Sequence, residues 1–94
     1  MKPLNEKITC KDGFHVSVQA SQYHYSTPRE DYPGEYTHVE CGFPSAHPGE
    51  EMARYQEMPD EDPTGCVYPY VPIAIVERML KSHGGISEGK MPTA

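Results

Sequence analysis

The sequence predicts an α+β fold in which a small antiparallel sheet of three or four strands packs against one C-terminal helix. Three observations lead to this prediction. Apolar and polar residues alternate near the N-terminus, and a proline-to-glycine helix signature lies near the C-terminus. Ten prolines and eight glycines in 94 residues predict short elements joined by long loops. A chain of this length supports one hydrophobic core, so we expect a single domain over residues 1–94 with flexible ends at 1–6 and 86–94.

The first two strands are expected as an N-terminal hairpin. The apolar positions of its second strand alternate with polar ones: Phe14, Val16, Val18 and Ala20. Two loop lengths compete at the turn. A three-residue loop ending at Gly13 pairs Cys10 with Phe14 and places Ile8 opposite Val16, so that all four share one face. A two-residue loop would send Ile8 and Cys10 to the polar face. We therefore predict the three-residue loop, with Gly13 in the left-handed conformation.

The middle of the chain predicts a third strand over residues 35–43 and one short helix after it. The inward positions of the strand are Thr37, Val39, Cys41 and Phe43, and the outward positions are Tyr36, His38 and Glu40. Pro48 fits the first turn of the short helix and Pro59 ends it. Met52 and Tyr55 would be its buried contacts.

The C-terminal part predicts a strand followed by the longest helix. Residues 66–71 have strand character, but Pro69 cannot donate to a ladder and therefore favours an edge position. Pro72 suits the first turn of a helix, and Gly84 and Gly85 suit its end. The apolar stripe of this helix recurs at helical spacing: Ile73, Val76, Leu80 and His83, widened by Ile75 and Met79.

The overall charge constrains the partner. Fourteen acidic residues against eight basic ones give a net charge of −6, without a cluster of Lys or Arg. Direct nucleic-acid binding and binding to an anionic membrane are therefore disfavoured, and a basic protein partner is favoured. The longest apolar stretch, residues 71–76, is too short for a membrane span, and the N-terminus carries no secretory signal. With an odd number of cysteines, these features predict a cytoplasmic protein.

The three cysteines are expected to pack in the core. They stand 31 and 25 residues apart, whereas a zinc site usually contains at least one close ligand pair. Burial as small apolar side chains is therefore favoured, and no cofactor is expected. Two alternatives stay open. One is a zinc site in a small metal-binding or structural protein with Cys10, Cys41 and Cys66 as ligands, and the other is a Cys10–Cys41 disulfide.

Catalytic motifs are absent from the sequence. It has no phosphate-binding glycine loop, no nucleophile elbow and no metalloprotease helix, and nothing near a cysteine would lower its pKa. A non-enzymatic protein is therefore expected, with a small enzyme of unknown reaction as a further alternative.

The segment from Glu30 to Asp62 is strongly acidic, with ten acidic residues and one basic residue, Arg54. Aromatic residues are interleaved with these charges, a combination common at binding hot spots. The predicted partner-binding residues are Glu30, Asp31, Tyr32, Glu35, Tyr36, Glu50, Glu51, Tyr55, Asp60, Glu61 and Asp62. The alternative is a set of solvated loops that keep the domain in solution. Tyr23 and Tyr25 form a second aromatic cluster, either an exposed strand end or a binding platform.

Three segments resemble short proteins encoded by tailed bacteriophages and prophages: residues 8–14, 41–45 and 71–86. The resemblance implies a class, because small acidic phage proteins often inhibit host defence, anti-CRISPR proteins among them. Such a protein would act in the host cytoplasm by occupying a basic surface of a host protein or nucleoprotein complex, such as a CRISPR effector. Apart from this resemblance, the edge strand that carries Pro69 and the exposed tyrosines could support a homo-oligomer.

Overall fold

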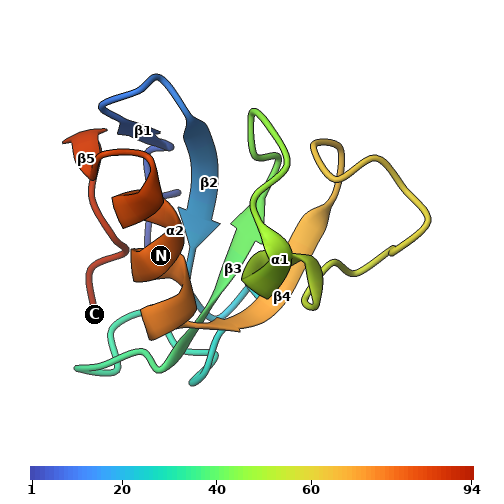
Figure 1. Ribbon diagram of the computed structural model, residues 1–94. Helices are drawn as coiled ribbons and strands as arrows, with labels where there is room; N and C mark the ends of the chain where they lie inside the picture. Colours follow the sequence, from blue (N-terminus) through green and yellow to red (C-terminus); the bar gives the residue numbers. More distant parts are fainter.

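The computed structural model describes residues 1–94 and has the predicted α+β architecture, with a five-stranded antiparallel sheet and two helices (Figure 1). The strands lie in the order β4-β3-β2-β1-β5. Their bounds are β1 Ile8–Cys10, β2 His15–Gln19, β3 His38–Gly42, β4 Val67–Pro72 and β5 Ile86–Glu88. The helices are α1, Glu50–Ala53, and α2, Ile73–Ser82. Neither helix has the length and apolar character needed to cross a membrane.

The N-terminal hairpin has the predicted three-residue loop. Ile8 pairs with Val16, and the backbone N–H of Cys10 donates to the carbonyl oxygen of Phe14 at 2.7 Å. Gly13 has a φ of 95°, a conformation that a side chain would make unfavourable. The buried face of the hairpin therefore carries the apolar residues that the alternating pattern predicted.

Strand β4 is an edge strand, as Pro69 predicted. Val71 pairs with Val39 of β3 and Tyr68 with Cys41, so Pro69 and the residue after it both lie opposite a single residue of β3. This two-against-one arrangement is a β-bulge. The proline occupies a position where the ladder is interrupted, and its missing N–H therefore costs no hydrogen bond.

The predicted facing of residues 35–43 is wrong at both ends of the strand. Val39 and Cys41 are buried as expected, but Phe43 is 57% exposed. The next residue, Pro44, is fully buried instead. At the other end Tyr36, expected outside, is buried, and Thr37, expected inside, is exposed. The strand is shorter than predicted, and strict alternation of burial holds only from His38 to Cys41, because Gly42 is buried next to Cys41.

Helix α2 follows directly from β4 and packs across the sheet (Figure 1). It starts after Pro72, and its C-terminal turn is closed by the backbone N–H of Gly85, which donates to the carbonyl oxygen of Leu80 at 3.0 Å. Gly84 and Gly85 have φ values of 89° and 84°, so both adopt the left-handed conformation expected at a helix end. The helix lies within the range predicted from its proline and glycine signals.

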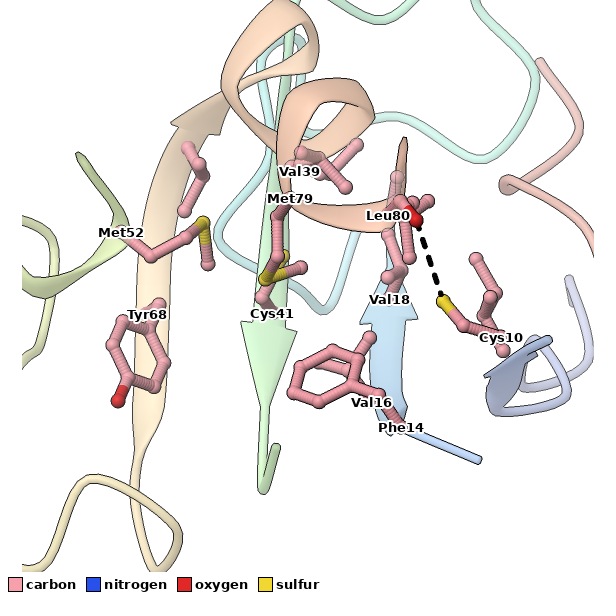
Figure 2. Close-up of a cluster of buried hydrophobic side chains, with 14 of the residues drawn as sticks. Cys10, Phe14, Val16, Val18, Val39, Cys41, Met52, Tyr68, Met79 and Leu80 are labelled. Atoms are coloured by element: carbon pink, nitrogen blue, oxygen red, sulfur yellow. Dashed lines mark hydrogen bonds between the residues drawn. The ribbon is translucent and has the colours of Figure 1, made fainter. Parts of the chain in front are cut away.

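A single cluster of 16 buried residues forms the core between the sheet and α2. Figure 2 shows Met79 and Leu80 of the helix facing Cys41 and Val18 of the sheet. The buried face of α2 consists of Val76, Met79 and Leu80. Helix α1 is anchored to this core through Met52, which is 1% exposed.

The two ends of the chain lie against the sheet and against each other. Residues 86–94 were expected as a tail, but Ile86–Glu88 pairs with β1 as the fifth strand. All three residues are exposed. The strand therefore has no buried face, and the sequence shows no alternation of apolar and polar residues that would predict it. The Nζ of Lys2 donates to the carbonyl oxygen of Thr93, and the Nδ2 of Asn5 donates to the carbonyl oxygen of Lys90 at 2.8 Å.

Candidate functional site

The acidic segment divides into two groups on different sides of the fold. Residues 30–36 lie beside the chain termini, where the backbone N–H of Gly34 donates to the carbonyl oxygen of Ala94 at 2.8 Å. Residues 50–62 include α1 and the loop before β4, on the opposite side of the molecule (Figure 1). The predicted partner-binding residues therefore do not form one surface.

The first group contains residues with structural roles. Tyr36 is 8% exposed, and its hydroxyl lies 2.6 Å from the carbonyl oxygen of Glu30 and 2.7 Å from that of Asp31. Burial raises the pKa of this phenol. The carboxylate of Asp31 accepts from the backbone N–H of Gln22 at 3.1 Å, and this bond lowers its pKa. The prediction that Tyr36 lies on an exposed binding surface is wrong.

The side chain of Lys2 links this group to the end of the N-terminal hairpin. Its Nζ donates to the carbonyl oxygen of Ala20 at 2.9 Å and lies 4.8 Å from the ring centroid of Tyr36 and 5.4 Å from that of Tyr32. Desolvation by burial lowers the pKa of this ammonium group. Exposed at this side are Glu30, Tyr32 and Glu35.

The second group presents its carboxylates to solvent. Its acidic residues are all exposed: Glu50, Glu51, Glu57, Asp60, Glu61 and Asp62. Glu51 forms a two-pronged ion pair with Arg78 of α2, with distances of 2.9 and 2.8 Å, and this hydrogen bonding lowers the pKa of Glu51. Tyr55, predicted as an interface residue, is partly buried against the core. The other predicted residues of this group remain accessible.

Residues 57–62, which we call the acidic loop, have a backbone held by its own hydrogen bonds. The Nε2 of Gln56 donates to the carbonyl oxygens of Met58 and Glu61, both at 2.9 Å. The carboxylate of Asp62 accepts from the backbone N–H of Thr64 at 2.9 Å, which lowers the pKa of Asp62. The backbone N–H of Glu57 donates to the carbonyl oxygen of the first residue of β4 at 3.0 Å. The backbone of the loop is therefore held by these hydrogen bonds, and Asp62 is the only residue of the loop whose carboxylate takes part in them.

Three side chains of the acidic loop have no partner within the protein. The carboxylates of Glu57, Asp60 and Glu61 make neither a hydrogen bond nor an ion pair, and Glu50 at the start of α1 makes none either. All four side chains are exposed. An opposite charge on another molecule could approach them without breaking an existing interaction.

Three exposed aromatic rings lie next to β4, and two of them, Phe43 and Tyr70, were not among the predicted partner-binding residues. Phe43 is 57% exposed, Tyr70 41% and Tyr25 38%, and the rings of Tyr25 and Tyr70 lie 5.7 Å apart. No sequence signal predicted the exposure of Phe43, because the proline that follows it favours extended backbone, whereas its φ is 51°. A signal for Tyr70 was the preceding Pro69, because proline inside a strand favours an edge position or a bulge. Tyr23 and Tyr25 lie in a turn region rather than in the strand end that was considered.

The three cysteines are buried and free, in agreement with the predicted core packing. Burial raises the pKa of the Cys41 thiol to about 12. The Sγ of Cys10 lies 3.8 Å from the carbonyl oxygen of Leu80 (Figure 2), and the Sγ of Cys66 lies 3.3 Å from that of Asp62. The predicted alternative of a Cys10–Cys41 disulfide is not formed. The structure brings together no group of three or more His, Cys, Asp or Glu side chains that could hold a metal ion.

Comparison with known proteins found no matching family model, no matching curated protein and no matching solved structure.

Proposed function

We propose that this protein is a non-enzymatic inhibitor that uses the acidic loop and Glu50 to occupy a basic surface of a partner protein. The observation that supports this proposal most strongly is the set of unpaired carboxylates on a loop with a defined backbone. Oriented charges of one sign steer a partner of the opposite sign and reject partners of the same sign. Because the loop is already ordered, little conformational entropy is lost on binding.

The partner in this proposal is a nucleic-acid-handling complex. Such complexes carry surfaces of clustered Lys and Arg that normally meet phosphates. A protein of net charge −6 with an exposed acidic loop is complementary to them. The resemblance to phage proteins narrows the proposal to a host-defence complex, with CRISPR effectors as one example, in the cytoplasm of a bacterial host.

The experiment is a pull-down from nuclease-treated bacterial lysate with three tagged forms of the protein. The test variant is Glu57→Lys/Asp60→Lys/Glu61→Lys, which leaves the structural carboxylates Glu51 and Asp62 untouched. The control is Glu30→Lys/Glu35→Lys, which places reversed charges on the opposite side of the fold.

We expect basic nucleic-acid-handling proteins to bind the wild type and the control, to be released by rising salt, and to be lost with the test variant. The proposal would be contradicted if the test variant and the wild type retained the same proteins at every salt concentration. A complex recovered in this way would then be assayed for inhibition by the purified protein.

A further inference from the structure

Two exposed aromatic residues have an unusual backbone conformation. Phe43 and Tyr70 have φ values of 51° and 52°, and they are the only residues other than glycine with a positive φ. Large side chains disfavour this left-handed region, and such outliers cluster at binding and active sites. Here the unfavourable geometry accompanies two large rings that are 57% and 41% exposed.

Both residues adjoin the edge strand β4. The backbone N–H of Phe43 donates to the carbonyl oxygen of Cys66, directly before the strand, at 3.1 Å. Tyr70 lies within the strand, in the bulge. The rise of about 3.3 Å per residue puts these two points roughly 10 to 13 Å apart along β4. An extended segment of four or five residues is long enough to reach both.

The acidic loop meets the same strand at its beginning. The backbone N–H of Glu57 donates to the carbonyl oxygen of Val67, and the Sγ of Cys66 lies 3.3 Å from the carbonyl oxygen of Asp62. Phe43 and the acidic loop therefore both contact Cys66 or its neighbour. The acidic loop therefore flanks the start of β4, the same strand that Phe43 contacts from the β3 side and that contains Tyr70.

The guanidinium group is the cation that best uses both kinds of contact. It stacks on aromatic faces and pairs with carboxylates through a planar fork, whereas the lysine ammonium is compact and strongly hydrated. The protein contains both contacts internally. The Cζ of Arg29 lies 5.3 Å from the ring centroid of Tyr25, the neighbour of Tyr70, and Arg78 pairs with Glu51 through two hydrogen bonds.

We propose, building on the function proposed above, that the β4 edge is a docking surface for an arginine-rich segment of the partner. Phe43 and Tyr70 receive guanidinium groups on their rings, and the acidic loop pairs with the neighbouring arginines. The aromatic residues discriminate arginine from lysine, and the carboxylates supply attraction that is common to both.

The test measures binding of two labelled peptides, four Arg-Gly repeats and four Lys-Gly repeats, by fluorescence anisotropy at low and physiological salt. The variant is Phe43→Asn/Tyr70→Asn, because asparagine tolerates the left-handed conformation while removing the rings. The control is Tyr32→Asn, which removes a ring that is 62% exposed in the residue 30–36 group.

We expect the arginine peptide to bind the wild type and the Tyr32→Asn control at least about five-fold more tightly than the lysine peptide. The double variant should bind both peptides equally. Thermal melting checks that the double variant is folded. If it is unfolded, the single variant Phe43→Asn replaces it in the binding comparison.

Equal affinity of the wild type for the two peptides would overturn the arginine preference and leave the function proposed above intact. Binding of neither peptide at low salt would overturn both. A third arm contains an oligothymidine of eight nucleotides, because exposed rings can also stack on bases. Tighter binding of the oligonucleotide than of the arginine peptide would contradict the inference in favour of a nucleic-acid partner.

Discussion

The ring of His83 stacks on the ring of Phe14, with centroids 3.9 Å apart and planes 5° from parallel. The same histidine places its Nδ1 2.6 Å from the Oδ2 of Asp12, and its carbonyl oxygen accepts the backbone N–H of that residue at 3.2 Å. The end of α2 is thereby held against the loop of the N-terminal hairpin. Residues 71 positions apart in the sequence share this contact.

Replacing His83 tests the contribution of this stack to stability. His83→Ala should lower the free energy of unfolding by about 1 kcal/mol, because an aromatic pair contributes roughly 0.5 to 1.5 kcal/mol beyond its buried area. His83→Phe is the matched control, since it keeps a ring on Phe14 and loses only the polar contact. Urea denaturation measures both. Equal losses in the two variants would show that the stack contributes little.

The Asp12 carboxylate predicts a change of stability with pH. Its pKa is lowered from the usual 3.8, first by the hydrogen bond from the backbone N–H of Phe14 and then by the one to His83. A carboxylate with a lowered folded-state pKa stabilises the fold above its unfolded-state pKa, and this contribution is lost as the pH falls through the folded-state value.

The measurement is thermal melting of the wild type and of Asp12→Asn between pH 7 and pH 2.5. We expect the wild type to be the more stable form at neutral pH, and its advantage to shrink as the pH falls below about 3.8. An advantage that stays constant across this range would contradict the assigned cause.

Tyr36 should matter for stability and not for binding. Tyr36→Phe removes the hydroxyl that bonds to the carbonyl oxygens of Glu30 and Asp31, and should cost about 1 kcal/mol of unfolding free energy. Affinity for the arginine peptide should be unchanged. A loss of affinity with an unchanged melting temperature would instead return Tyr36 to the interface where the sequence analysis placed it.

The thiol of Cys41 should resist modification in the folded protein. It is fully buried and its pKa is raised to about 12, so the reactive thiolate is scarce at pH 8. Labelling with iodoacetamide followed by mass spectrometry should show Cys41 modified only after unfolding in urea. Labelling of the native protein at the rate of a free thiol would contradict its position in the core.

The sequence predicted the fold best where local chemistry permits one solution. The register of the hairpin followed from the requirement that Ile8 and Cys10 face the same side as Phe14, and the edge position of β4 followed from Pro69. Strand β5 could not be predicted in this way, since its residues are exposed and its pairing with β1 depends on contacts distant in sequence.

The candidate site was harder to predict because charge does not specify position. Residues 30–36 and 57–62 belong to one acidic segment, but the intervening strand β3 carries these two stretches to different sides of the molecule (Figure 1). The alternating pattern also placed Phe43 in the core, whereas Phe43 is exposed and the next residue, Pro44, is buried. Phe43 and Tyr70 stand out from the other aromatic residues by their exposure together with their positive φ. The pattern of residue types in the sequence specifies neither property.

The most direct test of the account is nuclear magnetic resonance mapping of the basic-peptide surface. Isotope-labelled protein is titrated with the peptide of four Arg-Gly repeats, and backbone amide shifts are followed. We predict that the largest shifts lie in the acidic loop, residues 57–62, and at Phe43 and Tyr70, with residues 30–35 unaffected. Shifts centred on residues 30–35, or small shifts spread evenly over the surface, would contradict the assignment of the acidic loop and the β4 edge as the binding surface.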